Sequence, residues 1–332
     1  MTSSSTIRIA TRGSTLALWQ ARHVAERLGK EGLTCELQVI KTKGDRVQDR
    51  FLHEIGGKGL FVRELEEAMI RSEADLGVHS LKDLPAVLPD GFCLPAILKR
   101  HSPRDVMIFS PAAWEKVGPG GDLMPADLQT MAGMTIGTAS LRRQSLLKAH
   151  LPGCRPVPVR GNVDTRIRRL QEGEMDALIL ARAALERLGI EDDLHIRNLH
   201  TDWFVPSPAQ GALALECRAD HPLRETFRRL NDDITERCAT LERRVLERLG
   251  GDCTMPIGCF ISGAAGRWTA RAEVLNYTGN SAGATLTDEG SPLPGGTDPE
   301  TLATKIITTL KQNGLDPILR DIAETEPDPG NL

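Results

Sequence analysis

The chain has 332 residues, 40% of them hydrophobic and 26% charged, a length that exceeds one ordinary core and predicts two or three domains. Its formal net charge of −4 gives no general attraction to DNA or to an anionic membrane, and 4% aromatic residues are too few for a surface that stacks single-stranded bases. It contains no apolar run of about 18 residues and no signal-peptide pattern at its start, so we expect a cytoplasmic location.

The first hundred residues alternate short apolar segments with amphipathic helical patterns. A helix follows the first strand, and Ser14 can cap its start. Its expected apolar face consists of Ala17, Ala21, Val24 and Leu28. The order of strand, helix and strand predicts a parallel sheet with right-handed crossovers. The polar, glycine-rich stretch 42–59 is typical of a mobile loop or lid. Strands are expected at 7–10, 36–40 and 74–78, and a second helix at 60–71.

The segment His79-Ser-Leu-Lys-Asp-Leu-Pro85 follows the third expected strand. It brings Ser80, Lys82 and Asp83 to the carboxyl end of that strand, where α/β proteins bind ligands, and Pro85 should stop the strand. A lysine beside Asp83 would keep its carboxylate ionised and able to hold or move protons. The alternative for this segment is a solvated turn.

Two crossings between domains are expected in the middle of the chain. The first is Pro103–Pro125, which is rich in Pro and Gly, and the second is 206–211, after which 206–220 returns to the first domain. A second α/β unit lies between them, with strands at 134–138, 156–159 and 176–180 and helices at 141–151, 163–172 and 183–188. After about residue 221 the pattern changes to two amphipathic helices, strand-like pieces, a loop at 278–297 and a helix near 300–312. The predicted domains are 1–104 with 206–220, then 105–205, then 221–324, with a flexible tail at 325–332.

Positive charge is concentrated in residues 142–187, which hold nine arginines and one lysine against five acidic residues. Arg142 and Arg143 open a helix after a strand, Arg160 ends the next strand, and Arg12 occupies the equivalent corner of the first domain. Guanidinium groups bind carboxylate or phosphate bidentately, so convergent arginines indicate a polyanionic ligand. Because no phosphate-binding glycine loop follows a strand, several carboxylates are at least as plausible as phosphate. We expect three other arginines to be solvated surface: Arg155, Arg168 and Arg169.

Seven cysteines occur without a Cys-x-x-Cys pair, which argues against a disulfide framework or a structural zinc site. Cys253 lies in a glycine-rich turn between a helix and a strand, where its thiol could project and form a covalent bond. From spacing alone, a buried structural cysteine is the favoured interpretation.

Seven short segments occur in order along nearly the whole chain: Thr11–Ala21, Gly56–Phe61, His79–Asp83, Gly137–Gln144, Arg160–Arg166, Gln210–Ala212 and the turn at Cys253. Together they resemble the porphobilinogen deaminase (hydroxymethylbilane synthase) family. The turn reads Gly-Asp-Cys where some members of that family have Gly-Gly-Cys. The resemblance implies an α/β fold of three domains. The first two resemble the lobes of a type II periplasmic binding protein around a cleft, and a smaller third α/β domain carries a cofactor cysteine.

The resemblance also implies the site. A dipyrromethane cofactor would be bound through a thioether to Cys253, Asp83 would be the catalytic acid, and Lys58 and Phe61 would belong to the lid, with no metal. The implied ligands of the cofactor and substrate carboxylates are Arg12, Ser14, Lys82, Ser140, Arg142, Arg143, Arg160, Arg166, Arg187 and Gln210.

The implied reaction deaminates four porphobilinogen molecules and joins them head to tail into linear hydroxymethylbilane, releasing ammonia, in haem and other tetrapyrrole biosynthesis. Asp83 would stabilise the cation that forms as ammonia leaves. The expected partner is porphobilinogen, with no nucleic acid and no membrane, and the enzyme would be a monomer. A two-lobed binding protein without catalysis is the main rival, but it would need neither Cys253 nor Asp83. An RNA-binding protein is disfavoured by the small number of aromatic residues and by the negative net charge of the chain.

Overall fold

The computed structural model describes residues 6–41, 62–251, 255–264, 267–289 and 299–325. The expected lid at 42–59, with Lys58 and Phe61, and the turn at Cys253 lie outside these ranges. The chain divides into two compact units. Unit 1 comprises Met1–His101 and Gly211–Arg237, and unit 2 comprises Ser102–Gln210 and Cys238–Leu332.

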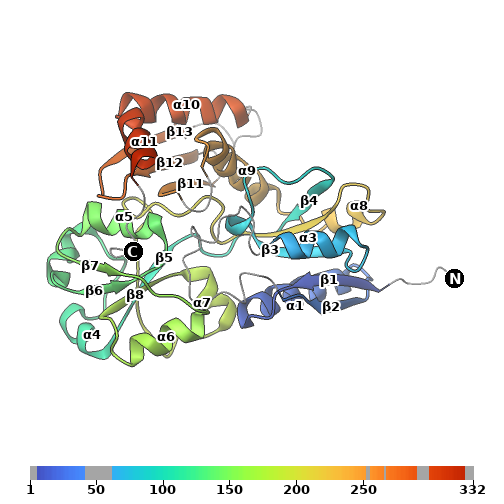
Figure 1. The fold of residues 1–332 in the computed structure, drawn as a ribbon, viewed down its shortest axis with the longest axis horizontal. Helices are drawn as coiled ribbons and strands as arrows, with labels where there is room; N and C mark the ends of the chain where they lie inside the picture. The colour runs from blue at the N-terminus through green and yellow to red at the C-terminus, as the bar shows by residue number, and fades with distance from the viewer. Residues whose placement is uncertain (1–5, 42–61, 252–254, 265–266, 290–298, 326–332) are drawn as a thin grey trace. The chain divides into compact units, whose positions relative to one another are not determined.

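Unit 1 contains a five-stranded sheet with the strand order β2-β1-β3-β10-β4 (Figure 1). Strands β1, β2 and β3 are parallel, as expected, but β10 runs antiparallel to both of its neighbours, so the sheet is mixed rather than parallel. The strands are β1 (Ile7–Thr11), β2 (Cys35–Val39), β3 (Leu76–Ser80), β4 (Phe92–Ile97) and β10 (Leu213–Arg218).

Helices cover both faces of this sheet. The helices of unit 1 are α1 (Thr15–Lys30), α3 (Arg63–Ile70) and α8 (Arg224–Arg228). Neighbouring side chains of β1 point to opposite faces, as in any strand. Ile9 therefore packs with Val24 of α1, whereas Ala10 packs with Leu65 of α3. The predicted apolar face of α1 is confirmed at Ala21, Val24 and Leu28, which are fully buried.

Unit 2 contains a second five-stranded sheet, with the order β7-β6-β8-β5-β9. Its strands are β5 (Asp105–Phe109), β6 (Thr135–Gly137), β7 (Arg155–Val157), β8 (Ala177–Ala181) and β9 (His195–Asn198). Its helices are α4 (Pro111–Val117), α5 (Leu141–His150), α6 (Val163–Gln171) and α7 (Arg182–Leu188), with a 3-10 helix η2 (Pro125–Met131).

The two five-stranded sheets have the same strand arrangement. In each, three parallel strands lie side by side and the next strand is antiparallel to the third; this antiparallel strand comes last in the chain order of the first sheet (β10) and first in that of the second (β5). The α/β fold and its two binding-protein-like lobes, expected from the sequence, are thereby confirmed.

The prediction that Pro103–Pro125 is only a crossing is wrong. This stretch contains β5 and α4, and all five residues of β5 are buried. Met107 and Phe109 pack on the side of α5, whereas Val106 and Ile108 pack on the side of α6 and α7. Because prolines and glycines flank this short apolar strand, the composition of the whole stretch is typical of a loop and did not indicate the strand.

Unit 2 also contains a three-stranded antiparallel sheet, β11-β12-β13, formed by β11 (Ile257–Ala264), β12 (Arg267–Leu275) and β13 (Ser281–Glu289). Helices α10 (Pro299–Gln312) and α11 (Leu315–Glu324) pack on it, and α9 (Asp233–Arg248) precedes it in sequence. The prediction of a loop at 278–297 is wrong for residues 281–289, which form β13 and pair with β12 along nine residues. Its small, polar residues carry little strand propensity, so backbone pairing with β12 decides the structure.

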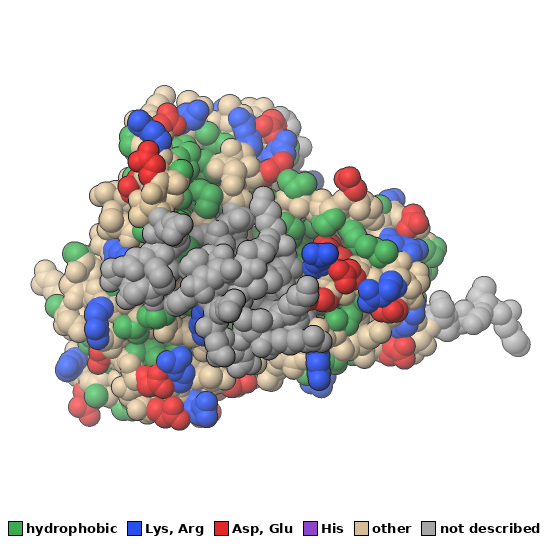
Figure 2. Space-filling view, in the orientation of Figure 1, with side chains coloured by type: hydrophobic (Ala, Val, Ile, Leu, Met, Phe, Trp, Pro, Cys, Tyr) green, Lys and Arg blue, Asp and Glu red, His purple; other side chains and the backbone are tan. Residues whose placement is uncertain are grey.

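The surface in Figure 2 mixes basic and acidic side chains of the described residues. Many of them form exposed ion pairs, such as Arg71 with Glu73 at 2.9 Å, which contribute little stability each. No helix within the described ranges is both long and apolar enough to cross a membrane.

Candidate active site

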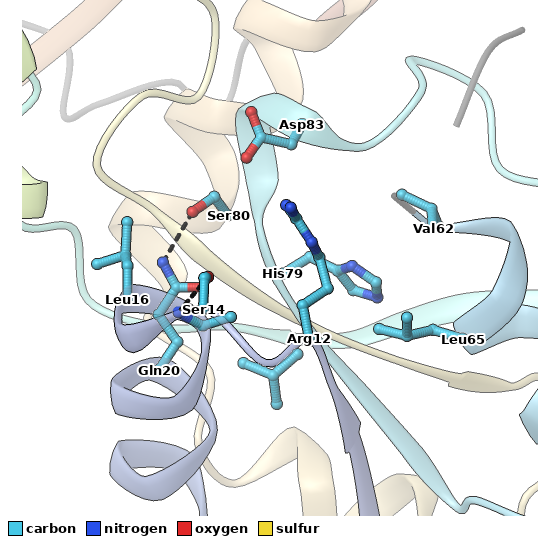
Figure 3. A pocket seen from close by; sticks show the side chains of 11 residues that line it. Arg12, Ser14, Leu16, Gln20, Val62, Leu65, His79, Ser80 and Asp83 are labelled. Atoms are coloured by element: carbon cyan, nitrogen blue, oxygen red, sulfur yellow. Dashed lines mark hydrogen bonds between the residues drawn. The ribbon is translucent and has the colours of Figure 1, made fainter. Parts of the chain in front are cut away.

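A cavity of about 80 Å³ lies in unit 1 at the carboxyl ends of β1 and β3 (Figure 3). Its polar lining comes from the corner between β1 and α1 and from the end of β3, while α3 adds apolar side chains. The polar residues of the lining are Arg12, Ser14, Gln20, His79, Ser80 and Asp83. The cavity therefore brings together Arg12, Ser14 and Asp83, three of the predicted site residues.

Helix α1 fixes the positions of two of these side chains, Ser14 and Gln20. Ser14 is its N-cap and accepts a hydrogen bond from the backbone N–H of Ala17 at 3.3 Å, as predicted from the sequence. Gln20, which is 4% exposed, donates from Nε2 to Oγ of Ser80 at 2.9 Å. Sequence analysis missed Gln20, although a polar residue on the buried face of an amphipathic helix could have indicated it.

Asp83 is presented by a single turn rather than by the strand itself. Strand β3 continues to Ser80, beyond the predicted end at residue 78, because Ser80 still pairs with Leu213 of β10. The 3-10 turn η1 (Leu81–Asp83), not Pro85, then ends it. Leu81 is fully buried and anchors the turn, which leaves Asp83 exposed and Lys82 half-buried. In Figure 3, Asp83 and the guanidinium end of Arg12 reach into the same region. Lys82 is in the turn but is not part of the cavity lining.

Behind the cavity lies a buried acid–base group that sequence analysis also missed. Nε2 of His79 is 2.9 Å from Oε2 of Glu216, and Glu216 is completely buried. Burial and the charge of Glu216 raise the pKa of Glu66 on α3 to about 7, against the opposing influence of His79. Glu66 therefore changes charge near neutral pH next to the floor of the cavity.

Replacing Glu66 by glutamine is expected to stabilise unit 1 at pH 8 but hardly at pH 5. The folded state holds the Glu66 proton more tightly than the unfolded state, so wild-type stability falls as pH rises from about 4.5 to about 7. After discounting for solvent screening of a half-exposed group, we expect a gain on the order of 1 kcal/mol at pH 8. Urea unfolding of the variant and the wild type at pH 5 and pH 8 measures this gain in stability. Glu67→Gln, on the exposed side of the same helix, is the control, and an equal gain at both pH values would contradict the assignment.

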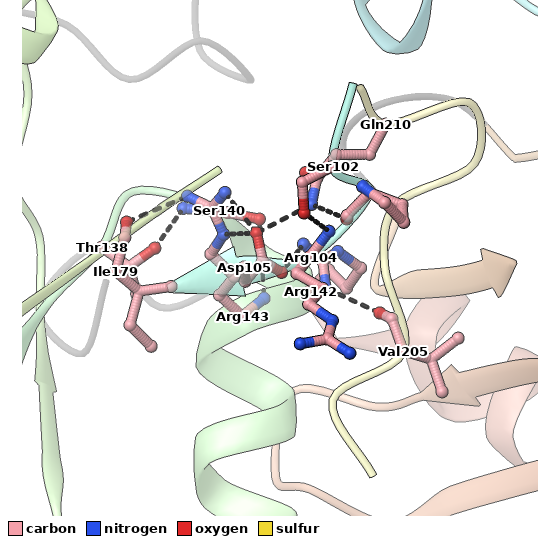
Figure 4. A network of polar contacts seen from close by, with 11 residues as sticks. Ser102, Arg104, Asp105, Thr138, Ser140, Arg142, Arg143, Ile179, Val205 and Gln210 are labelled. Carbon is pink, nitrogen blue, oxygen red and sulfur yellow. Dashed lines mark hydrogen bonds and ion pairs between the residues drawn. The ribbon is translucent and has the colours of Figure 1, made fainter. Parts of the chain in front are cut away.

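In unit 2, a completely buried carboxylate joins two of the predicted arginines (Figure 4). Asp105 opens β5 and accepts hydrogen bonds from Nη2 of Arg142 at 2.6 Å and from Nη2 of Arg143 at 2.7 Å. Arg142 also donates to the carbonyl of Val205 at 2.7 Å, and Arg143 to that of Ile179 at 3.0 Å. The two arginines are 4% and 6% exposed, so they are held in fixed positions.

Two more predicted residues complete this cluster. Gln210, fully buried, donates from Nε2 to Asp105 at 2.9 Å and to the carbonyl of Pro103 at 2.7 Å. Ser140 caps α5 and accepts from the backbone N–H of Arg143 at 3.5 Å. Asp105 itself was missed, although an acidic residue that begins a buried apolar strand requires a partner.

Further positive charge lies nearby. Nε of Arg166 donates to the carbonyl of Gly161 at 2.7 Å. Burial, together with the charges of Arg143 and Arg160, lowers the pKa of Arg166 to about 10. Mutual repulsion of this kind would be relieved by an anionic group. Arg187, at the end of α7, is 4% exposed.

The arginines expected on the surface are found there. Arg155 and Arg168 are exposed, and Arg169 pairs with Glu174 at 2.6 Å. Of the predicted site residues within the described ranges, Arg12, Ser14 and Asp83 thus come together in unit 1, and Ser140, Arg142, Arg143 and Gln210 gather around Asp105 in unit 2. No cluster of three or more His, Cys, Asp or Glu side chains that could hold a metal occurs within the described ranges.

Comparisons with known proteins show to which proteins the chain is similar. Residues 7–225 match the family model described as porphobilinogen deaminase, dipyromethane cofactor binding domain. The porphobilinogen deaminase of Legionella pneumophila (strain Paris) is 46% identical over 283 residues, covering 84% of this chain and 87% of that protein. The porphobilinogen deaminase of Stenotrophomonas maltophilia (strain R551-3) is 40% identical over 317 residues, which cover 95% of this chain and 99% of that protein. The porphobilinogen deaminase of Chromobacterium violaceum is 42% identical over 277 residues, which cover 82% of this chain and 85% of that protein.

Proposed function

Because the chain belongs to the porphobilinogen deaminase family, we propose a role for each part of its site in that family's reaction. The enzyme joins porphobilinogen units into a linear tetrapyrrole with release of ammonia and uses a dipyrromethane cofactor. When bound, this cofactor supplies the pyrrole carbon to which the incoming unit is joined.

The observation that carries the proposal is the shared cavity of Asp83 and Arg12 in unit 1. In the proposal, the Asp83 carboxylate accepts a hydrogen bond from the pyrrole N–H of porphobilinogen. As ammonia leaves, positive charge spreads over the substrate ring, and a fixed carboxylate lowers the energy of that state. The same carboxylate can take up the proton that is lost when the ring regains aromaticity.

Arg12 supplies the charge that holds the substrate beside Asp83. Its guanidinium can bind an acetate or propionate carboxylate bidentately, and the Ser14 and Ser80 hydroxyls can donate further hydrogen bonds. Lys82, in the same turn as Asp83, is proposed as an additional cation for these carboxylates.

The arginine-rich group of unit 2 fits the cofactor, whose pyrrole rings carry acetate and propionate groups. Burial, and then the charges of Arg143 and Arg160, lower the pKa of Arg166, and ligand carboxylates would offset both influences. We therefore assign carboxylate binding to the remaining predicted residues that can donate to it, Ser140, Arg142, Arg143, Arg160, Arg166 and Arg187. Gln210, which donates to Asp105 and to the carbonyl of Pro103, is assigned the role of holding Asp105 in place.

Four further assignments are carried over from the family. Cys253 is proposed as the covalent anchor, and Lys58 and Phe61 as lid residues. The three-domain division, with domains of 1–104 plus 206–220, 105–205 and 221–324 and a tail at 325–332, is proposed alongside the two compact units. A monomer acting in the cytoplasm completes the proposal.

Replacing Cys253 by alanine is expected to remove the cofactor. The denatured wild-type protein should show an intact mass above that of the polypeptide by two condensed pyrrole units, and Cys253→Ala should show the polypeptide mass alone. Cys259→Ala, six residues away in β11, is the matched control and should retain the added mass. If both variants retained it, the anchor would be another residue; bare wild-type protein that gains no mass with porphobilinogen would contradict the cofactor assignment itself.

A further inference from the structure

Glu242, in the middle of α9, is a completely buried carboxylate without a role in the site described so far. Its two oxygens accept backbone hydrogen bonds from separate segments. Oε2 accepts from the N–H of Ala209 at 2.6 Å, and Oε1 accepts from the N–H of Ile261 in β11 at 2.8 Å. A buried carboxylate is costly unless it is hydrogen-bonded, so these contacts explain how Glu242 is tolerated.

Ala209 is held in an unusual backbone conformation. Its φ of 61° lies in the left-handed region, which L-residues other than glycine seldom adopt, and its side chain is fully buried. Such a conformation is unfavourable for an L-residue and persists only where the surroundings hold it. The hydrogen bond from Ala209 to Glu242 is one contact that holds it.

The residues around Ala209 are the ones that contact the arginine-rich group. Gln210, the next residue, donates to Asp105, and the carbonyl of Val205 accepts from Arg142. On the other side, the carbonyl of Pro206 accepts from the N–H of Cys259 in β11 at 2.9 Å. Segment 205–210 is thus fixed between α9 and β11 on one side and the Asp105 cluster on the other.

We propose that Glu242 is a positioning residue for the carboxylate-binding arginines. Through Ala209 it fixes the shape of segment 205–210, so that Gln210 and the Val205 carbonyl hold Asp105 and Arg142 in place. The inference rests on the proposed function, because it assumes that the arginine group binds the acidic ligand. Helix α9 ends at Arg248, five residues before Cys253 in sequence, so one helix carries this support and leads to the proposed anchor.

The test is Glu242→Gln, assayed for KM and kcat with porphobilinogen on cofactor-loaded enzyme. A glutamine of the same shape presents an NH₂ group to one of the two backbone donors, so one hydrogen bond is lost. We expect a smaller share of the purified variant to carry the cofactor, measured by intact mass, and the KM of the loaded enzyme to rise about tenfold, since small displacements of binding groups have effects of this size. Leu310→Ala, fully buried in α10, which packs on β12, β13 and α11, is the control; it should lower the unfolding temperature and leave KM unchanged.

A double variant separates positioning from general destabilisation. If Glu242 acts through Gln210, the effects of Glu242→Gln and Gln210→Ala on kcat/KM should not add, because each breaks the same chain of contacts. A wild-type KM in Glu242→Gln, or additive effects, would overturn the proposal. If Gln210→Ala also left KM unchanged, the proposed binding function of the arginine group would fail instead.

Discussion

Replacing Asp83 by asparagine is expected to lower kcat by about 10²- to 10⁴-fold, the range usual for loss of a group that transfers protons and stabilises charge. Asparagine has nearly the same shape and can still accept a hydrogen bond, but it carries no charge and takes up no proton. Because Asp83 is exposed on a turn anchored by buried Leu81, the fold should be unaffected.

The measurement is product formation from porphobilinogen, with the intact mass checked first to show that the cofactor is present. Asp90→Asn, another exposed aspartate of unit 1, located just before β4, is the matched control and should keep normal turnover. Turnover by Asp83→Asn close to that of the wild type would exclude the proposed role.

Replacing Asp105 by asparagine is expected to destabilise unit 2 by about 3–5 kcal/mol, because it leaves two buried guanidinium groups without their counter-charge. Arg142 and Arg143 cannot turn to solvent, since each also donates to a buried carbonyl. Both arginines would also lose their orientation, so cofactor loading should fall together with stability.

Urea unfolding measures the loss, with Asp122→Asn as control. Asp122 pairs with Arg104 at 2.9 Å, but both side chains are partly exposed, so its loss should cost less than about 1 kcal/mol. Combining Asp105→Asn with Arg143→Met restores the net charge of the cluster. The double variant should therefore lose less stability than the sum of the losses in the two single variants. Equal stability losses in Asp105→Asn and Asp122→Asn would show that the buried cluster has no special importance.

The sequence predicted β1, β2, β3, α1 and α3 of unit 1, because these elements depend on local patterns, but it predicted neither β4 nor the antiparallel direction of β10. The apolar face of α1 follows from helical spacing, and Ser14 caps α1 because its hydroxyl lies one turn before Ala17 N–H. The polar residues at the strand ends followed from the same periodicity, since parallel strands bring their carboxyl ends to one edge of the sheet.

What the sequence did not predict depends on contacts between distant residues. Strand β5 is short and lies between prolines and glycines, and its identity comes from pairing with β8, about 70 residues later. Helix α11 was missed because Gly314 and Pro317 look like breakers. However, Gly314 turns the chain with a φ of 93°, and Pro317 lies in the first turn, where proline is tolerated. Asp105 and Glu242 could not be assigned roles because their hydrogen-bond partners lie 19 or more residues away.

The position of β10 has a consequence for how the protein forms during synthesis. The strand lies between β3 and β4 in the sheet of unit 1, yet it leaves the ribosome more than 100 residues after them. At usual elongation rates of about 5–20 residues per second, the facing edges of β3 and β4 stay unpaired for roughly 5–25 s. Unpaired edges of apolar strands are sites of aggregation, so the nascent chain depends on chaperones, or on rapid folding of the intervening lobe, until Arg218 has emerged.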